Sequence, residues 1–187
     1  MFPDATIESA PAPLNAFCAA DIRAILSERG WLPISESAQG GDSPLGAWLA
    51  RAAQLLGPQA ATREDLEQMF SLVFAYDAPT LLGEPASHAL LARSGAREVI
   101  RELANRVLAD GEIDSDAFKS LIDSLKAAVP HRGPALFGPI RLALAGKIGE
   151  GKFDRVILLL DSAAKLEFAQ PVKGTRQRIL EFCAALD

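Results

Sequence analysis

The stretch AREVIRELANRVLA, residues 96–109, carries the clearest pattern in a chain of 187 residues. Its apolar side chains Val99, Ile100, Leu103 and Val107 recur at the spacing that places them on one face of an α-helix. Hydrophobic residues make up 49% of the chain and aromatic residues 6%, with Ala and Leu more frequent than the β-branched types. This balance favours helices packed on helices over a sheet.

The same spacing recurs on both sides of this stretch and predicts an all-α fold of eight or nine helices. Gly30 is expected to end the first helix, and Gly57 with Pro58 to end the second. Thr62 and Asp65 have the spacing of a capping box with Asp in place of Glu, which opens the third helix. The predicted helices cover residues 15–29, 44–56, 63–74, short pieces within 80–93, 96–109, 115–129, 136–145, 153–162 and 175–186.

The first part of the chain is expected to be an extension of the main domain. Residues 1–14 hold three prolines and predict a flexible lead-in, while the Gly- and Ser-containing residues 35–43 are the best linker candidate. We therefore predict an N-terminal extension with one helix and a linker over residues 1–45, followed by a helical domain over residues 46–187.

Two further features indicate where the protein works. No apolar run reaches the roughly 18 residues needed to span a bilayer, and the first residues lack the basic region of a secretory signal. Cys18 and Cys183 lie at opposite ends of the chain and fit reduced, buried thiols better than a long-range disulfide. These observations predict a cytoplasmic protein that has no membrane partner.

The segment DGEIDSD, residues 110–116, is similar to part of a calcium-binding loop, but its spacing is wrong. An EF-hand places Gly at position 6, so position 1 falls on Arg106 and position 12, which needs a bidentate carboxylate, falls on Ala117. We interpret the segment as the end of one helix, with Gly111 as its C-cap, and the start of the next.

The residues needed for catalysis are scarce. The two histidines, His88 and His131, stand in neither metal-ligand nor catalytic-triad spacing, and we interpret them as a turn residue on the surface and a loop residue. No phosphate-binding loop, nucleophile elbow or zinc-protease motif occurs. The sequence therefore predicts a protein that is not an enzyme and holds no metal or cofactor.

Charge is distributed unevenly along the chain, whose net charge is −5. Residues 1–92 contain eleven acidic and four basic residues, whereas residues 93–187 contain thirteen acidic and fifteen basic ones. A basic stretch between residues 124 and 152 fits a local polyanion site or a solvated face equally well. Its only acidic residue is Glu150, and its basic residues are Lys126, Arg132, Arg141, Lys147 and Lys152.

The segment HRGPALFGPIRLALAG, residues 131–146, resembles the C-terminal anticodon-binding domain of bacterial glutamyl-tRNA synthetases. That family carries the motif Pro-Leu-Arg-x-Ala-Leu-Thr-Gly, and Ile140 replaces its Leu. The matching residues are Pro139, Arg141, Ala143, Leu144 and Gly146. The resemblance covers about residues 46–165 and implies an all-α, multi-helix bundle or cage.

The resemblance also implies a binding site for an anticodon loop. In the family, the arginine of the motif and the loop after its helix contact an anticodon base of tRNA(Glu), which points to Arg141 and to a lip over residues 147–153. Guanidinium groups read unpaired bases through hydrogen bonds and stacking, and a helix N-terminus near Pro139 would add amide donors. The candidate RNA-binding residues are Arg132, Arg141, Lys147, Lys152 and Phe153.

Some positions depart from this family. Ala145 stands where the motif has Thr, and Glu150 brings a negative charge to the loop that would face a bound phosphate. The nucleotide-binding fold and ATP-handling signatures of a class I synthetase are missing from the sequence, so this chain is not expected to charge tRNA. An alternative role for Arg141 is an ion pair with acidic side chains of neighbouring helices.

Two functions of different classes remain. The first is a non-catalytic RNA-binding domain whose partner is a tRNA, with tRNA(Glu) as the candidate that the resemblance names. The second is a helical protein–protein interaction module that kept the scaffold and lost RNA binding. The acidic surplus of residues 1–92 favours the second, because that part of the chain would repel RNA.

Overall fold

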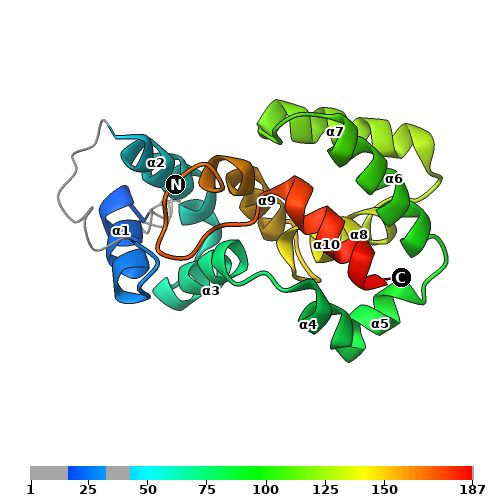
Figure 1. The fold of residues 1–187 in the computed structure, drawn as a ribbon, viewed down its shortest axis with the longest axis horizontal. Coiled ribbons are helices and arrows are strands. Elements are labelled where there is room, and N and C mark those ends of the chain that lie inside the picture. The colour runs from blue at the N-terminus through cyan, green and yellow to red at the C-terminus, as the bar shows by residue number, and fades with distance from the viewer. Residues whose placement is uncertain (1–16, 33–42, 187) are drawn as a thin grey trace, which may run out of the picture.

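The computed structural model describes residues 17–32 and 43–186, and every regular element within them is a helix (Figure 1). The all-α prediction is confirmed. The predicted lead-in over residues 1–14 and nearly all of the predicted linker lie outside the described residues. The α-helices are α1 (Ala19–Glu28), α2 (Pro44–Leu56), α3 (Arg63–Phe74), α4 (Ala78–Gly83), α5 (Pro85–Leu91), α6 (Ala96–Ala109), α7 (Ser115–Ala128), α8 (Pro134–Ala145), α9 (Lys152–Ala163) and α10 (Thr175–Leu186).

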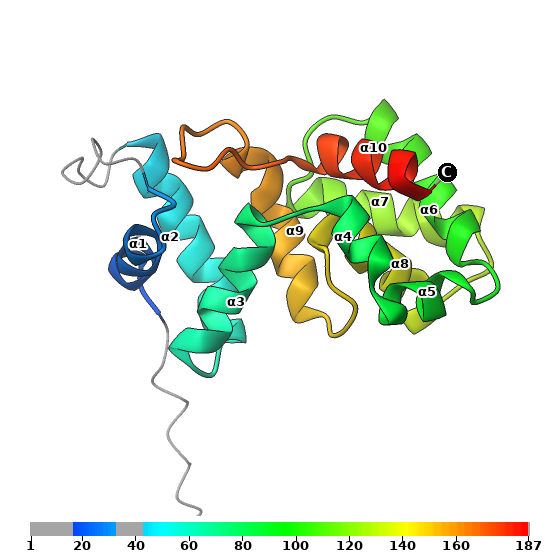
Figure 2. The same cartoon turned by 60° about the horizontal axis from the view of Figure 1, so that its bottom comes forward.

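Helix α9 lies between two hydrophobic cores and supplies side chains to both (Figures 1 and 2). Val156 and Leu159 belong to the core formed with α1, α2 and α3, which we call the N-terminal core. Ile157 and Leu158 belong to the core formed with α4 to α8 and α10, the C-terminal core. A helix covered on two sides needs apolar residues nearly all round, which explains the run VILLL at residues 156–160.

Helix α1 begins later than the predicted residue 15. Cys18 is its N-cap, and the Asp21 carboxylate accepts a hydrogen bond of 2.8 Å from the Cys18 N–H. This local cap sets the start of the helix, while Gly30, with φ of 68°, follows its end as expected. Helix α1 packs on α2 within the N-terminal core. The division of the chain at residues 45 and 46 stays a prediction.

The expected capping residues are mostly in place. The Thr62 hydroxyl accepts a hydrogen bond from the Asp65 N–H at 3.1 Å, and the Asp65 carboxylate accepts one from the Thr62 N–H at 3.2 Å, so the capping box is confirmed. Asp114 caps α7 by accepting hydrogen bonds from two backbone N–H groups. The assignment of Gly111 as the C-cap of α6 is wrong, because the extended residue Asp110 has that position.

Helices α8 and α9 are each longer than predicted. Helix α8 starts at Pro134 rather than residue 136, because Gly133 adopts a positive φ of 53° as its N-cap and proline suits the first helical position. Pro139 therefore lies inside the helix, and the prediction of a helix N-terminus near it is wrong. Helix α9 extends one residue further at each end than predicted.

Helix α10 is held by a buried arginine that reaches both halves of the molecule. Arg178 is 0% exposed, and its guanidinium donates hydrogen bonds to the carbonyl oxygens of Lys173 at 2.9 Å, Leu144 at 2.8 Å and Val73 at 2.6 Å. Leu144 belongs to α8 and Val73 to α3, so one side chain joins the two cores. Burial lowers the pKa of Arg178 to about 10.

The start of α10 is fixed by a carboxylate from α9. Asp161 accepts hydrogen bonds from the backbone N–H of Thr175 at 2.7 Å, from the Thr175 hydroxyl and from the Ile113 N–H at 2.8 Å. A Cβ on Gly174 would lie 2.8 Å from an oxygen of this carboxylate, so the close approach requires glycine. Together these contacts tie α9, α10 and the α6–α7 connection. None of the described helices is long and apolar enough to cross a membrane.

Candidate nucleic-acid interface

The segment that resembles the synthetase motif, residues 131–146, forms α8 and its C-cap, and it leads into the α8–α9 loop, residues 146–151. Gly146 ends α8 with a φ of 75°, and a Cβ there would come within 3.2 Å of the Tyr76 ring and of Leu81. At Gly149, with a φ of 150°, a Cβ would lie 2.9 Å from the ring of Phe153. The loop therefore needs its glycines to bend back tightly onto the start of α9.

The guanidinium group of Arg141 is hydrogen-bonded to other residues of the same chain. Its Nε and one terminal nitrogen donate to the two oxygens of Asp154 at 2.7 and 2.8 Å, and the other terminal nitrogen donates to the Gly149 carbonyl at 2.8 Å. Its guanidinium carbon lies 5.1 Å from the ring centroid of Phe137, and 13% of the side chain is exposed. This is the ion-pair role given above as the alternative for Arg141. The hydrogen bonds of Arg141 to Asp154 and Gly149 hold the α8–α9 loop against α9.

A cavity of about 420 Å³ opens beside Arg141 and Phe137. The N-terminus of α8 borders it at Gly133 and Pro134, and the exposed side chain of Arg93 stands at its rim, without a partner in the described part of the chain. We call it the Arg141 cavity. It is lined by Leu90, Arg93, Gly133, Pro134, Phe137, Gly138, Arg141, Ile148 and Gly149.

The other predicted RNA-binding residues lie outside this cavity. Arg132 uses its guanidinium to bind the carbonyl oxygens of Val129, His131 and Lys126 at 2.6 to 2.7 Å, which fixes the chain before α8. The Lys152 ammonium lies 5.7 Å from the ring centroid of Phe153, which is half-buried against the C-terminal core. Lys147 is exposed on the other side of the α8–α9 loop.

Arg93 is the site residue that the sequence did not reveal. It stands after α5, in a region that the sequence predicted only as short helical pieces, and no motif marks it. The fold brings it next to α8 because α5 packs on α8 through Leu90, whose side chain would meet a Cβ on Gly138 at 3.1 Å. An isolated arginine with no pattern around it gives no signal in a single sequence.

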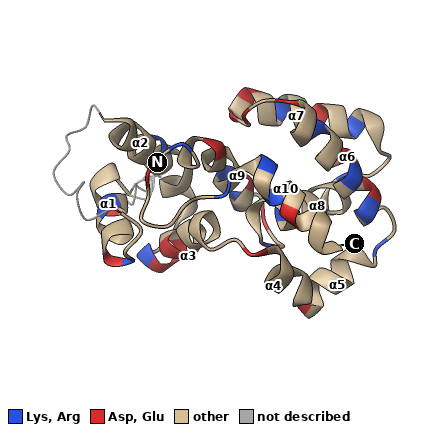
Figure 3. Cartoon of the chain, in the orientation of Figure 1, with Lys and Arg blue, Asp and Glu red and all other residues tan. Residues whose placement is uncertain are grey.

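The basic stretch of residues 124–152 does not form one surface of free cations within the described structure. Lys126 pairs with Asp123, Arg132 binds carbonyl oxygens and Arg141 pairs with Asp154. Acidic and basic residues intermingle on α6, α7, α9 and α10 (Figure 3). Any polyanion site must therefore rest on a few cations such as Arg93 rather than on a continuous basic face.

Most arginines of the acidic residues 1–92 are bound to other groups of the protein. Arg29 and Arg63 both bind Glu67, and Arg63 also binds Glu28. The hydrogen bonds from Arg29 and Arg63 hold the pKa of Glu67 below its usual value. Arg51 donates to a backbone carbonyl of α9. Among the described residues of this half, Arg29, Arg51 and Arg63 are therefore all bound within the chain.

The histidine and cysteine side chains do not come together in one site within the described residues. His131 lies in a loop, as expected, with Nε2 3.0 Å from a carboxylate oxygen of Glu98, whereas His88 belongs to α5 and not to a turn. Cys18 is exposed and Cys183 half-buried, so the prediction of buried thiols is wrong. Over residues 17–32 and 43–186, no three His, Cys, Asp or Glu side chains are grouped to hold a metal ion.

The chain was compared with protein families, curated proteins and solved structures. The family described as "Anticodon binding domain" matches residues 22–160, which begin in α1 and end within α9. The searches of curated proteins and of solved structures gave no match. The matched region includes α8, the α8–α9 loop and every residue that lines the Arg141 cavity. The chain belongs to the anticodon-binding domain family.

Proposed function

We propose that this protein binds RNA without catalysing a reaction, and that it receives a single-stranded loop of a tRNA at the Arg141 cavity. The observation that carries the proposal is the combination of Phe137, Arg141 and Arg93 around one opening, where Arg93 has no side-chain partner among the described residues. An unpaired base can stack on an aromatic ring or a guanidinium plane, and a nearby cation can bind its phosphate. The resemblance of residues 131–146 favours tRNA(Glu) among tRNAs.

Arg141 has a defined part in this proposal although its polar atoms bind Asp154 and Gly149. The pairing holds the guanidinium plane at the cavity wall, and the flat face of that plane does not take part in hydrogen bonding. Stacking of a base on this face leaves the Asp154 pair intact. Arg93 at the rim then supplies the electrostatic attraction, which is expected to depend strongly on salt.

Binding of labelled tRNA(Glu) and of a non-cognate tRNA, followed by fluorescence anisotropy between about 50 and 200 mM salt, tests the proposal. We expect tighter binding of tRNA(Glu). The Arg93→Gln variant should weaken binding and reduce the slope of log K against log salt by about one, as for the loss of one phosphate contact. The Phe137→Leu variant should weaken binding about tenfold through lost stacking, with the salt slope unchanged.

Arg101→Gln is the matched control, because Arg101 is also exposed and lies on α6, outside the lining of the Arg141 cavity. It should leave the affinity within twofold of the parent protein. If no tRNA binds at the lowest salt concentration, or if Arg93→Gln and Arg101→Gln act alike, the Arg141 cavity is not an RNA site.

The second candidate function is a helical module that binds another protein. The observation in its favour is the acidic first half, in which Arg29 and Arg63 are already paired with Glu28 and Glu67. Such a surface attracts a basic partner and repels RNA. Absence of tRNA binding at low salt, together with capture of a basic protein partner that Glu64→Lys weakens, would establish this function.

A further inference from the structure

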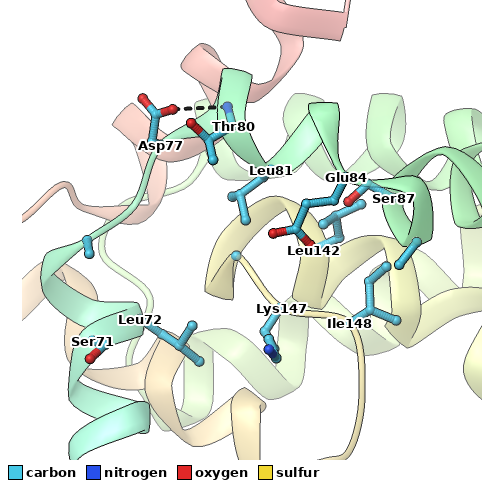
Figure 4. A pocket seen from close by; sticks show the side chains of 13 residues that line it. Ser71, Leu72, Asp77, Thr80, Leu81, Glu84, Ser87, Leu142, Lys147 and Ile148 are labelled. Atoms are coloured by element: carbon cyan, nitrogen blue, oxygen red, sulfur yellow. Dashed lines mark hydrogen bonds between the residues drawn. The ribbon is translucent and has the colours of Figure 1, made fainter.

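A second cavity, also of about 420 Å³, lies on the opposite side of the α8–α9 loop (Figure 4). It is formed by the end of α3, by α4 and α5, by Leu142 of α8 and by the loop itself, and of the candidate RNA-binding residues only Lys147 borders it. We call it the Glu84 cavity. Its lining residues are Ser71, Leu72, Ala75, Asp77, Thr80, Leu81, Glu84, Ala86, Ser87, Leu142, Gly146, Lys147 and Ile148.

Glu84 and Lys147 are the charged groups available in this cavity. Glu84 is the N-cap residue of α5, yet its side chain makes no capping hydrogen bond and points into the cavity (Figure 4). Lys147 borders the cavity from the loop opposite. Neither side chain has an ion pair or a hydrogen bond among the described residues, although their charges are opposite. Two unpaired groups of opposite sign across an open space suit a ligand that carries both donors and acceptors.

The rest of the lining defines the shape and polarity of such a ligand. Leu72, Leu81 and Ile148 supply partly exposed apolar surface, which suits a flat, apolar ring face. Asp77 is occupied, because its carboxylate accepts a hydrogen bond of 3.0 Å from the Thr80 N–H, and that bonding keeps its pKa below the usual value. With two carboxylates against one ammonium, the cavity disfavours a phosphate and favours a neutral ring.

Ser87 indicates independently that a hydrogen-bonding group is missing from this wall of the cavity. It is 1% exposed, it lines the same cavity next to Glu84, and its hydroxyl has no hydrogen-bond partner among the described residues. Buried polar groups in folded proteins nearly always have a partner, so the Ser87 hydroxyl calls for one that the described residues do not supply.

We infer that the Glu84 cavity binds a guanine base. The base-pairing edge of guanine presents one acceptor oxygen beside two adjacent N–H donors, and no other common base offers two adjacent donors there. The Glu84 carboxylate can accept both N–H groups, while the Lys147 ammonium donates to the oxygen, as lysine does to this atom in nucleic-acid complexes. The base is either that of a free nucleotide or one within an RNA strand, and the second source rests on the proposed function.

Titration with guanosine monophosphate, followed by NMR shifts of the Leu72, Leu81, Leu142 and Ile148 methyl groups, tests this inference. Adenosine, cytidine and uridine monophosphates serve as competitors of equal charge. We expect guanosine monophosphate to bind about tenfold tighter than the adenosine compound, as one bidentate contact provides. Glu84→Gln should remove this preference, and Lys147→Met should weaken guanosine monophosphate binding several-fold.

The controls are Glu64→Gln and Lys119→Met, which remove the same charges from exposed positions on α3 and α7 that lie outside the cavity. They should leave the binding unchanged. The inference is overturned if guanosine monophosphate at millimolar concentration shifts none of these methyl groups, if the adenosine compound binds equally well, or if the control variants act like Glu84→Gln.

Short RNA strands with and without a single guanine separate the two sources of the base. If guanosine monophosphate shifts the methyl signals and the guanine-containing strand does not, the ligand is a free nucleotide. If the guanine-containing strand produces the same shifts, the ligand is RNA. Because the free nucleotide is measured without any tRNA, failure of tRNA to bind would defeat the proposed function and leave the guanine site standing.

Discussion

The guanidinium carbon of Arg178 lies 4.5 Å from the centroid of the Tyr76 ring, at the point where the two cores meet. The Tyr76 hydroxyl donates to the carbonyl of Ala143 at 2.6 Å, while Arg178 binds carbonyl oxygens of α3 and α8. No carboxylate contacts this buried cation within the described residues, so its charge is balanced by carbonyl dipoles and by the face of the ring. The pair therefore links the N-terminal core to the C-terminal core through α3, α8 and α10.

Replacement of Arg178 by methionine should lower the free energy of unfolding by about 3 kcal/mol or more, because it removes the hydrogen-bond donors of two buried carbonyl groups and one part-buried carbonyl group. Urea denaturation monitored by tryptophan fluorescence measures the loss. Arg176→Met is the control, since Arg176 stands on the same helix but is exposed and binds one carbonyl. A loss under about 1 kcal/mol for Arg178→Met would show that the cation contributes little.

Tyr76 makes stability depend on alkaline pH. Burial raises its pKa from the usual value of 10.0, so above pH 10 the unfolded chain loses a phenolic proton that the folded chain keeps. The folded state then binds more protons, and its stability falls as the pH rises. Tyr76 is the only tyrosine, so phenolate absorbance reports it alone. We expect that absorbance to appear together with unfolding; a smooth titration near pH 10 in the folded protein would contradict the expectation.

Arg178 acts in the opposite direction over the same range. Burial lowers its pKa to about 10 in the folded chain, so as the pH rises above that value the unfolded chain holds more protons than the folded one and stability rises with pH. Tyr76→Phe removes the opposing contribution of the tyrosine. Its unfolding free energy should therefore decline less steeply above pH 10 than that of the parent protein, as urea denaturation at a series of pH values would measure.

The Arg141–Asp154 pair should be strongly coupled. Arg141→Met and Asp154→Ala are each expected to cost about 1.5–3 kcal/mol, because the remaining partner is left partly buried without its hydrogen bonds. The double variant should cost clearly less than the sum, with a coupling energy of about 1–2 kcal/mol. The exposed pair Lys126–Asp123 is the comparison, and its coupling should be below about 1 kcal/mol. Equal coupling in both cycles would mean that Arg141 does not hold the loop.

Gly95 is required by its histidine neighbour as well as by its backbone. It has a φ of 85°, and a Cβ there would lie 1.9 Å from Nε2 of His131. Gly95→Ala should therefore destabilise the protein by about 1–3 kcal/mol through strain and displacement of the ring. Adding His131→Ala should restore only the part due to the clash, as thermal unfolding of the single and double variants would reveal. If the double variant regains no stability, the whole loss in Gly95→Ala is due to backbone strain.

The helices could be predicted from the sequence because their signals are local. The apolar spacing of residues 96–109 gave both ends of α6, and Thr62 with Asp65 marked the start of α3. The start of α1 was missed because Asp21 reaches back to Cys18, a contact that competes with the apolar pattern over residues 15–18. The start of α3 was recognisable because Thr62 is a common N-cap residue, whereas Cys18, the N-cap of α1, is not a residue type that marks a helix start.

The candidate site was predicted less completely, because its parts come from distant segments. The motif located Arg141, but periodicity does not specify that Asp154, on the next helix, accepts hydrogen bonds from two of its three nitrogens. Arg178 carries the pattern of an exposed helical arginine and is instead the largest fully buried side chain among the described residues. Which cation is buried, paired or available is settled by packing between helices, and a single sequence holds no record of it.

The Arg141 cavity and the Glu84 cavity share one side chain, Ile148 of the α8–α9 loop. An occupant that displaces Ile148 from one side changes the wall that an occupant on the other side meets. The two binding free energies are then linked, and by thermodynamic reciprocity each ligand changes the affinity of the other by the same factor. With the ligands proposed for both cavities, this loop of six residues would let the occupancy of one cavity set the affinity of the other.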